Sequence, residues 1–213
     1  MDLQRVRQFT EDLLSDDQSG HAMDHIDRVL KHAEAILPTE PSADSAVTLA
    51  IVLLHESFDD KLDRTVDNQA VIDLLSYAGF ERVDTENILH SIHNLSYSKN
   101  IKVKHRLSIE GQIAQDADRL DALGALGVAR TFYYGGAKGH ALYSHSDPKI
   151  SQDAEDYRSD QNCRNHFYDK LLRLKDLMNT DEGKRLAQDK HEFMVTFLRE
   201  FEAEIGIETY GKQ

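Results

Sequence analysis

Apolar residues recur along this chain at spacings of three and four rather than in alternation, which predicts helices almost throughout. In one segment Ala22, Ile26, Val29 and Ala33 follow the spacing of an amphipathic helix, and Pro38 marks its end. Only three prolines interrupt the chain. We predict an all-α helical bundle with helices near Leu3–Leu14, Ala22–Leu37, Ala46–Leu54, Asp67–Tyr77, Thr85–Leu95, Leu107–Tyr134, Asp153–Met178 and Asp181–Ile205.

The chain of 213 residues falls within the range of one domain, and it shows neither an internal repeat nor a linker. We therefore predict a single domain over residues 1–213. The longest irregular stretch begins at Tyr134-Gly-Gly-Ala-Lys-Gly-His140 and continues to Pro148. A long loop inside a compact domain is either functional or an ordinary solvated surface, and both interpretations stay open.

Composition excludes several classes of protein. No apolar stretch approaches the roughly 20 residues of a membrane-spanning helix, and the N-terminus lacks the apolar core of a secretory signal, so we expect a cytoplasmic protein without a membrane partner. Cys163 is the only cysteine, so the chain cannot form an intrachain disulfide. The net charge of -13 argues against nucleic-acid binding, but a divalent ion can still make a site attractive to a small anionic substrate.

His55 and Glu56 end a segment that is apolar nearly all the way round, Ala46 to Leu54, for which Ser42 or Asp44 is the candidate N-cap. Ionisable side chains at the end of a buried helix are costly unless a partner or a metal compensates them. Imidazole and carboxylate ligands together suit borderline or hard divalent ions. The pair is therefore a candidate metal site, and an ordinary exposed helix end is the alternative.

Two further clusters accompany this pair. His21, His25, Arg28 and His32 form a strip along one edge of the second helix, and His25 is placed to point toward the core edge.

Downstream, Asp116, Asp118 and Asp121 place three carboxylates within six residues of a predicted helix. Mutual repulsion disfavours such crowding without a cation. Asp118 and Asp121 are expected to lie near one another on the helix surface, with Asp116 on the other side of the apolar stripe, and a solvated acidic face is the alternative interpretation.

Taken together, His25-x-x-Arg-Val, His55-Glu56 and Ala-Asp118-x-Leu resemble the successive motifs of the HD superfamily of metal-dependent phosphohydrolases. The resemblance is closer still to a small bacterial branch of nucleoside-triphosphate pyrophosphohydrolases. It includes Gly20-His21, Gln115 to Gly124, Ala129-Arg-Thr-Phe132 and Gly135 to Gly139. The family implies an HD-type bundle with a metal site at its centre.

By this resemblance His25, His55, Glu56 and Asp118 are the ligands of a divalent ion (Mn²⁺, Mg²⁺ or another transition metal), and Asp116 competes with Asp118 for the last place. The family's own doublet is His-Asp, so Glu56 is one methylene longer than expected. Glu56 either binds the ion from a slightly withdrawn backbone, binds it through water, or leaves the site weak.

The family also places an acidic proton-transfer group at the position of Asp59, with Asp60 as the less favoured alternative. The cations or potential cations nearest the motifs are predicted to neutralise phosphate. Lys61, which we also assign to catalysis, and His93 rank first; the others are Arg28, Arg119 and Lys138. His21 either contacts phosphate or merely flanks the metal ligand.

The leading hypothesis is a metal-dependent phosphohydrolase that cleaves nucleoside triphosphates to monophosphate and pyrophosphate. The same site would also suit a phosphomonoesterase or a cyclic-diester phosphodiesterase, because fold and metal do not fix the substrate. A third hypothesis is a catalytically weak regulator that binds a nucleotide or a metal. The expected partner is a small phosphorylated molecule, in particular a nucleotide, and a homo-oligomer stays open.

Overall fold

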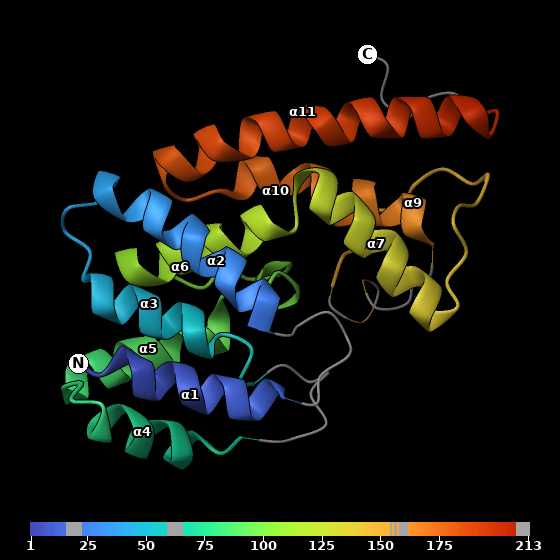
Figure 1. Cartoon of the computed structure of the whole chain (residues 1–213). Coiled ribbons are helices and arrows are strands. Elements are labelled where there is room, and N and C mark those ends of the chain that lie inside the picture. Colours follow the sequence, from blue (N-terminus) through green and yellow to red (C-terminus); the bar gives the residue numbers. More distant parts are fainter. Residues whose placement is uncertain (16–22, 59–65, 154, 156, 158–161, 208–213) are drawn as a thin grey trace. The chain divides into compact units, whose positions relative to one another are not determined.

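The computed structural model describes residues 1–15, 23–58, 66–153, 155, 157 and 162–207, and within them it is helical, as predicted (Figure 1). An isolated bridge between Ala141 and Asn162 is the one β pairing in this part of the chain. None of its helices is both long enough and apolar enough to cross a membrane. The chain divides into two compact units, residues 1–118 and 119–213.

The first unit is arranged around the short apolar helix α3. Asp44 caps this helix by accepting hydrogen bonds from the amides of Ala46 and Val47, and the side chains from Ala50 to Leu54 are buried. Burial of each large aliphatic side chain contributes about 1.5–3 kcal/mol to folding. Helices α1, α2 and α5 pack against α3. The bounds in this unit are α1 (Leu3–Leu14), α2 (Met23–Ile36), η1 (Leu37–Thr39), α3 (Ser45–Leu54), α4 (Asn68–Tyr77), α5 (Arg82–Asn94) and η2 (Ser98–Asn100).

Helix α6 (Ile109–Asp121) begins in the first unit and ends in the second. In the second unit α7 packs against α11 and α9, and an aromatic cluster lies between these helices. The ring of Phe132 lies 5.6–6.1 Å from those of Phe167, Phe197 and Phe201. The bounds here are α7 (Gly124–Lys138), α9 (Cys163–His166), the π-helical η3 (Phe167–Leu171), α10 (Leu172–Leu174), η4 (Lys175–Leu177) and α11 (Asp181–Glu204).

Three of the predicted boundaries were wrong. The helix predicted over Leu107–Tyr134 is broken after Asp121, because Leu123 is extended and Gly124 has a φ of 74°. Helix α7 then continues through Gly135 to Lys138, where an irregular stretch was predicted. The helix predicted over Asp153–Met178 is, in its described residues 162–177, a succession of short α, π and 3-10 segments.

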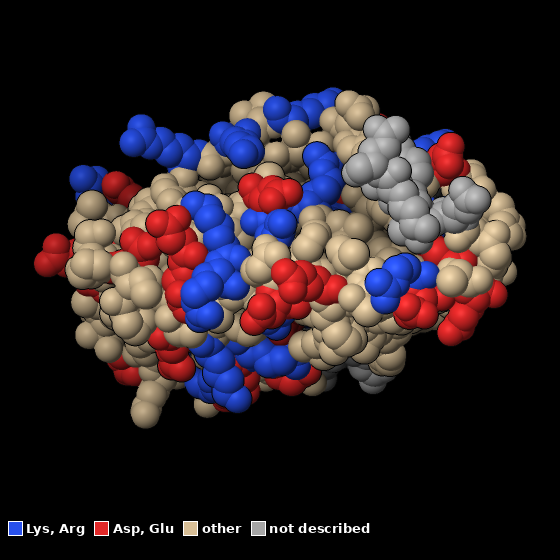
Figure 2. All heavy atoms as spheres, turned by 90° about the horizontal axis from the view of Figure 1, so that it is seen from above, with Lys and Arg blue, Asp and Glu red and all other residues tan. Residues whose placement is uncertain are grey.

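Charged side chains of both signs are interspersed on the face seen in Figure 2. On α11, Arg185 pairs with Glu182 and Lys184 pairs with Asp181.

Candidate metal centre

His55 and Glu56 are both buried at the point where α3 ends. Leu54 is the last helical residue, and His55 occupies the C-cap position with helical dihedral angles. His55 is 8% exposed and Glu56 is 6% exposed. The prediction that a buried helix delivers these two polar side chains into the interior is confirmed, and the alternative of an exposed helix end is excluded.

Ligand atoms from three elements converge beside them. His25, on α2, is 2% exposed, and its Nε2 lies 3.2 Å from Nε2 of His55. Oε1 of Glu56 lies 3.4 Å from both of these nitrogens. Oδ1 of Asp118, on α6, lies 3.7 Å from His25 and 3.8 Å from His55. All four residues belong to the first unit.

These separations fit one divalent ion. Two ligands bound at about 2.1 Å lie roughly 3.0 Å apart at a right angle and roughly 3.4 Å apart at a tetrahedral angle. The cluster therefore needs only small movements to close on an ion. Its donor set of two imidazoles and two carboxylates suits Mn²⁺, Zn²⁺ or another borderline ion better than it suits Ca²⁺.

The orientation of His55 also agrees with a ligand role. Its Nδ1 lies 2.6 Å from the carbonyl oxygen of Val52, which can accept a hydrogen bond but cannot donate one. Nδ1 therefore carries the hydrogen, and Nε2 is the nitrogen that faces the cluster. A backbone carbonyl on the distal nitrogen is the usual partner of a metal-binding histidine.

Negative charge around His55 is strong enough to hold a proton in the absence of an ion. Burial alone would lower the pKa of His55, but the hydrogen bond and charge of Glu56, together with the charge of Asp118, raise this pKa to about 9. The cluster thus attracts positive charge beside Nε2 of His55, where Glu56 and Asp118 approach.

The three aspartates of α6, Asp116, Asp118 and Asp121, do not form a solvated acidic face. Asp118 joins the two histidines, and their ligand atoms lie within 4.8 Å of one another. Asp116 is fully buried, and the group of His25, His55 and Asp118 includes neither Asp116 nor Glu56. Asp121 was expected on the surface; it is instead 1% exposed, and it pairs with Arg130 of α7 across 2.5 Å.

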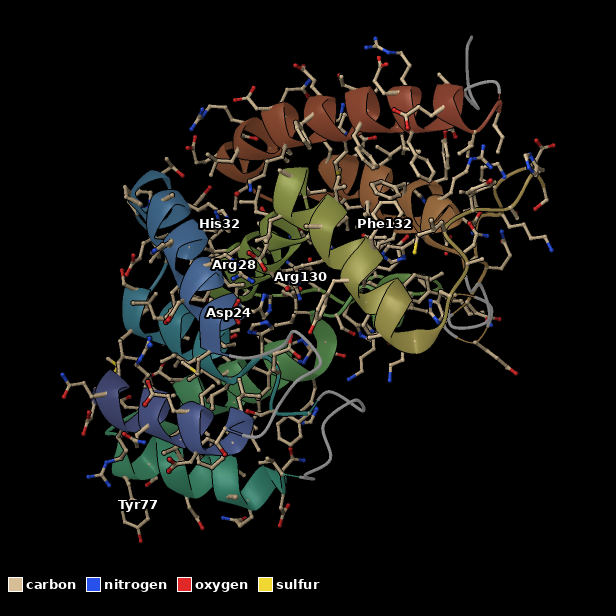
Figure 3. The ribbon with its side chains drawn as sticks, turned by 45° about the vertical axis from the view of Figure 1, so that its right-hand side comes forward. Asp24, Arg28, His32, Tyr77, Arg130 and Phe132 are labelled. Carbon is tan, nitrogen blue, oxygen red and sulfur yellow. The ribbon has the colours of Figure 1, made fainter. Side chains whose placement is uncertain are left out.

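The predicted phosphate-binding residues of the first unit lie on α2 and α5. Arg28 extends along α2 and donates to Asp24 across 2.6 Å, and His32 follows one turn later (Figure 3). His93 lies in the last turn of α5, with Nε2 2.7 Å from Oδ1 of Asn68. Burial and the charge of Lys99 lower the pKa of His93.

Two more predicted cations lie in the second unit. Arg119 is buried, and its Nη1 donates to the carbonyl oxygen of Leu177. Lys138 is exposed at the end of α7, with Nζ 5.9 Å from the centroid of the Tyr134 ring. Their roles as substrate-binding residues stay predictions. The remaining predicted residues, His21, Asp59, Asp60 and Lys61, lie outside the described residues.

Sequence reasoning missed Phe58, which lies two residues beyond Glu56. Its ring packs against the imidazole of His93, with the centroids 4.3 Å apart and the planes inclined by 31°. An aromatic residue two positions after a candidate metal ligand was the available signal.

Comparisons with known proteins agree with this fold. No family model matches the chain. A crystal structure of an HD-superfamily hydrolase from Bacillus thuringiensis is 36% identical and covers 97% of both chains, with a TM-score of 0.73. A crystal structure from Lactobacillus plantarum is 35% identical and covers 96% of this chain and 97% of its own, with a TM-score of 0.86. The chain belongs to the HD superfamily of hydrolases.

Within that superfamily the chain is similar to the protein YpgQ of Bacillus subtilis. The two sequences are 38% identical over 205 residues, which make up 95% of this chain and 93% of YpgQ. The crystal structure of YpgQ in complex with ADP has a TM-score of 0.76, with 36% identity over 95% of this chain and 96% of YpgQ. The similarity therefore extends far beyond the metal-binding motifs.

Proposed function

We propose that this protein is a metal-dependent phosphohydrolase that cleaves nucleoside triphosphates between the α and β phosphates, releasing a monophosphate and pyrophosphate. The observation that carries the proposal is the convergence of two buried imidazoles with the buried carboxylate of Glu56 and the half-buried carboxylate of Asp118 at the end of α3. Buried charges of this density need a cation. HD-superfamily hydrolases of the same fold support a hydrolytic reaction.

In this proposal His25, His55, Glu56 and Asp118 hold one divalent ion. When bound, such an ion polarises a phosphoryl oxygen and lowers the pKa of a coordinated water. The burial of His25, His55 and Glu56 limits the access of bulk water and holds their ligand atoms in fixed positions. Glu56 acts as a direct ligand, because its Oε1 is as close to both imidazoles as a tetrahedral arrangement requires.

Proton transfer is assigned to Asp59, and Lys61 is assigned as a phosphate-binding cation, although both lie outside the described residues. In the sequence Asp59 follows Glu56 by three residues. A carboxylate at that position can accept the proton of the attacking water. Arg28 is a further candidate for neutralising phosphate charge, because its guanidinium lies on the helix that carries His25.

A nucleotide substrate is supported by the relative YpgQ, which was crystallised with ADP. ADP contains the same α–β phosphoanhydride bond that the proposed reaction breaks. A small anionic substrate is also compatible with a protein of net charge -13, because the ion would make the site locally positive.

Product identity tests the proposal. The purified protein would be incubated with each nucleoside triphosphate and with Mn²⁺ or Mg²⁺, and the products separated by ion-exchange chromatography. We expect monophosphate and pyrophosphate in equal amounts. Orthophosphate with a diphosphate intermediate would instead indicate stepwise phosphatase action. Products from a cyclic dinucleotide or from a simple phosphomonoester would favour the other hydrolytic hypotheses.

Paired variants test the ligand assignment. Asp118→Asn is expected to remove activity, whereas Asp116→Asn should retain more of it, since Oδ1 of Asp118 lies 3.7 and 3.8 Å from the two imidazole Nε2 atoms. Asp73→Asn, on the exposed face of α4, is the control. If Asp116→Asn loses more activity than Asp118→Asn, and circular dichroism shows that both variants are folded, the fourth ligand would be Asp116.

A further inference from the structure

The ring pair Phe58–His93 lies next to the candidate metal centre. Phe58 is two residues from Glu56, so their Cα atoms are at most about 7 Å apart. Its ring contacts the imidazole of His93 at a centroid distance of 4.3 Å, and both side chains are only half-buried. The pair therefore combines aromatic surface that is open to solvent with immediate proximity to a ligand of the proposed ion.

Contacts from two other elements hold His93 in place. Nε2 of His93 donates to Oδ1 of Asn68, the first residue of α4, across 2.7 Å. Nζ of Lys99, in η2, donates to the carbonyl oxygen of His93 across 2.8 Å. A ring that is fixed before a ligand arrives loses less conformational entropy when the ligand binds.

The segment that carries His93 is locally basic. Residues 87–109 contain no aspartate or glutamate but include Lys99, Lys102, Lys104 and Arg106, in a chain whose net charge is -13. The side chains of these four residues are exposed, and Lys99 contacts His93 directly. Positive charge of this kind favours phosphorylated ligands.

We propose that Phe58 and His93 form the nucleobase subsite, against which the base of the nucleotide stacks while its phosphates reach the ligand cluster at His55 and Glu56. This inference rests on the proposed function and specifies the part of the substrate that the aromatic rings recognise. Stacking is tolerant of base identity, because every base has a π face. The subsite thus selects nucleotides over bare phosphates without selecting one base strongly.

Binding of two matched ligands tests this inference without any turnover. Isothermal titration calorimetry with Mn²⁺ present would measure the affinity for α,β-methylene-ADP and for methylenediphosphonate, which has the same bridged phosphates but no nucleoside. Phe58→Leu keeps an apolar side chain but removes the flat ring. We expect Phe58→Leu to lower the affinity for α,β-methylene-ADP by roughly 5- to 150-fold, the equivalent of about 1–3 kcal/mol for one stacked base. The affinity for methylenediphosphonate should not change.

Controls separate stacking from general damage. Phe58→Tyr keeps the ring and should keep the affinity for α,β-methylene-ADP. Tyr77→Leu removes an exposed ring at the end of α4 and should change the affinity for neither ligand. If Phe58→Leu does not fold, His93→Asn carries the same expectation, because it also removes a ring of the pair. Equal weakening of both ligands, or no weakening of either, overturns the inference.

The result also differs from a failure of the proposed function. If no nucleotide is hydrolysed but Phe58→Leu still weakens α,β-methylene-ADP selectively, the ring pair binds a base in a protein that is not the proposed hydrolase. If wild type hydrolyses nucleotides but binds methylenediphosphonate as tightly as α,β-methylene-ADP, the hydrolase stands and the base subsite is overturned.

Discussion

His55 and Val52 form a hydrogen bond within the last turn of α3 that directs Nε2 of His55 toward His25. The bond joins Nδ1 to the Val52 carbonyl oxygen across 2.6 Å, and the two imidazole Nε2 atoms then lie 3.2 Å apart. Because the helix end fixes the ring, the ligand geometry is present before an ion binds. The site therefore depends both on the backbone at the end of α3, which orients His55, and on the packing of α2 against α3, which places His25.

Metal binding should stabilise the folded protein through this geometry. At a concentration of Mn²⁺ 100 times its Kd, binding contributes about 2.7 kcal/mol. For a chain of this size that corresponds to a rise in Tm of roughly 5–10 °C. Differential scanning fluorimetry with Mn²⁺ and then with excess EDTA would measure the rise and its reversal.

His55→Ala should abolish this rise and lower kcat/KM by at least about 100-fold, since even the loss of a partner outside the ligand set commonly costs 10- to 100-fold. His90→Ala, at an exposed position of α5, is the matched control and should keep the rise in Tm that Mn²⁺ causes. A normal Mn²⁺ shift in folded His55→Ala would show that the ion binds elsewhere.

Glu56→Asp tests whether glutamate is required here. Glu56 Oε1 lies 3.4 Å from both imidazoles, and removing one methylene withdraws the carboxylate by about 1.5 Å unless the backbone follows. We expect the Mn²⁺ concentration for half-maximal activity to rise about tenfold. Titration of activity against Mn²⁺ would measure it. A large gain in turnover would instead mark the native site as attenuated, as the regulator hypothesis requires.

Helical periodicity predicted most of the fold because it depends only on nearest neighbours along each helix. It could not distinguish Asp116 from Asp118, since both positions lie close to the apolar stripe of α6. The choice depends on where His25 and His55 lie in space, and only tertiary structure supplies that. Phe58 was missed for the same reason, because its partner His93 is 35 residues away.

Two glycines explain why the start and the end of α7 were predicted wrongly. Gly124 has a φ of 74° and breaks a helix that the apolar pattern continues, whereas Gly135 lies inside a helix where a loop was predicted. A Cβ at position 135 would lie 2.4 Å from Sγ of Cys163. Gly135 therefore serves close packing of α7 against α9, and sequence alone does not separate that role from a turn.

Glu110 should make stability depend on pH. Its carboxylate accepts hydrogen bonds from the amide of Asp44 (3.1 Å) and from Asn87 (3.2 Å), and so joins α6 to α3 and α5. Burial would raise the pKa of Glu110, but these bonds and one from Ser108 outweigh burial and lower it. A lowered pKa stabilises the fold above the ordinary value of 4.5, and this stability is lost as the pH falls through the folded-state pKa.

Glu110→Gln is therefore expected to destabilise the protein at pH 7, by less than about 1 kcal/mol because the side chain is partly exposed. The difference from wild type in the free energy of unfolding should shrink as the pH falls below 4.5. Urea denaturation at pH 7, 5 and 3 would follow it. A difference that persists undiminished at pH 3 would mean that shape, rather than charge, is what position 110 contributes.

Gly111→Ala should destabilise the crossing of α5 and α6. A Cβ at position 111 would lie 2.6 Å from Oγ of Ser91, which is fully buried, and 3.1 Å from Cβ of Leu107. Overpacking of this kind costs about 1–3 kcal/mol, while alanine favours a helix over glycine by about 1 kcal/mol. We expect a net loss of about 1 kcal/mol in the free energy of unfolding, measured in urea.

Two comparisons make the origin of that loss specific. Gly136→Ala is the matched control, because a Cβ there meets no atom within 4 Å and alanine should stabilise α7 instead. In a Ser91→Ala background, Gly111→Ala should cost less, because the closest contact is gone. Helix α6 also carries Asp118, so Gly111→Ala should weaken Mn²⁺ affinity where Gly136→Ala does not. Equal effects of Gly111→Ala with and without Ser91 would place the clash elsewhere on α6.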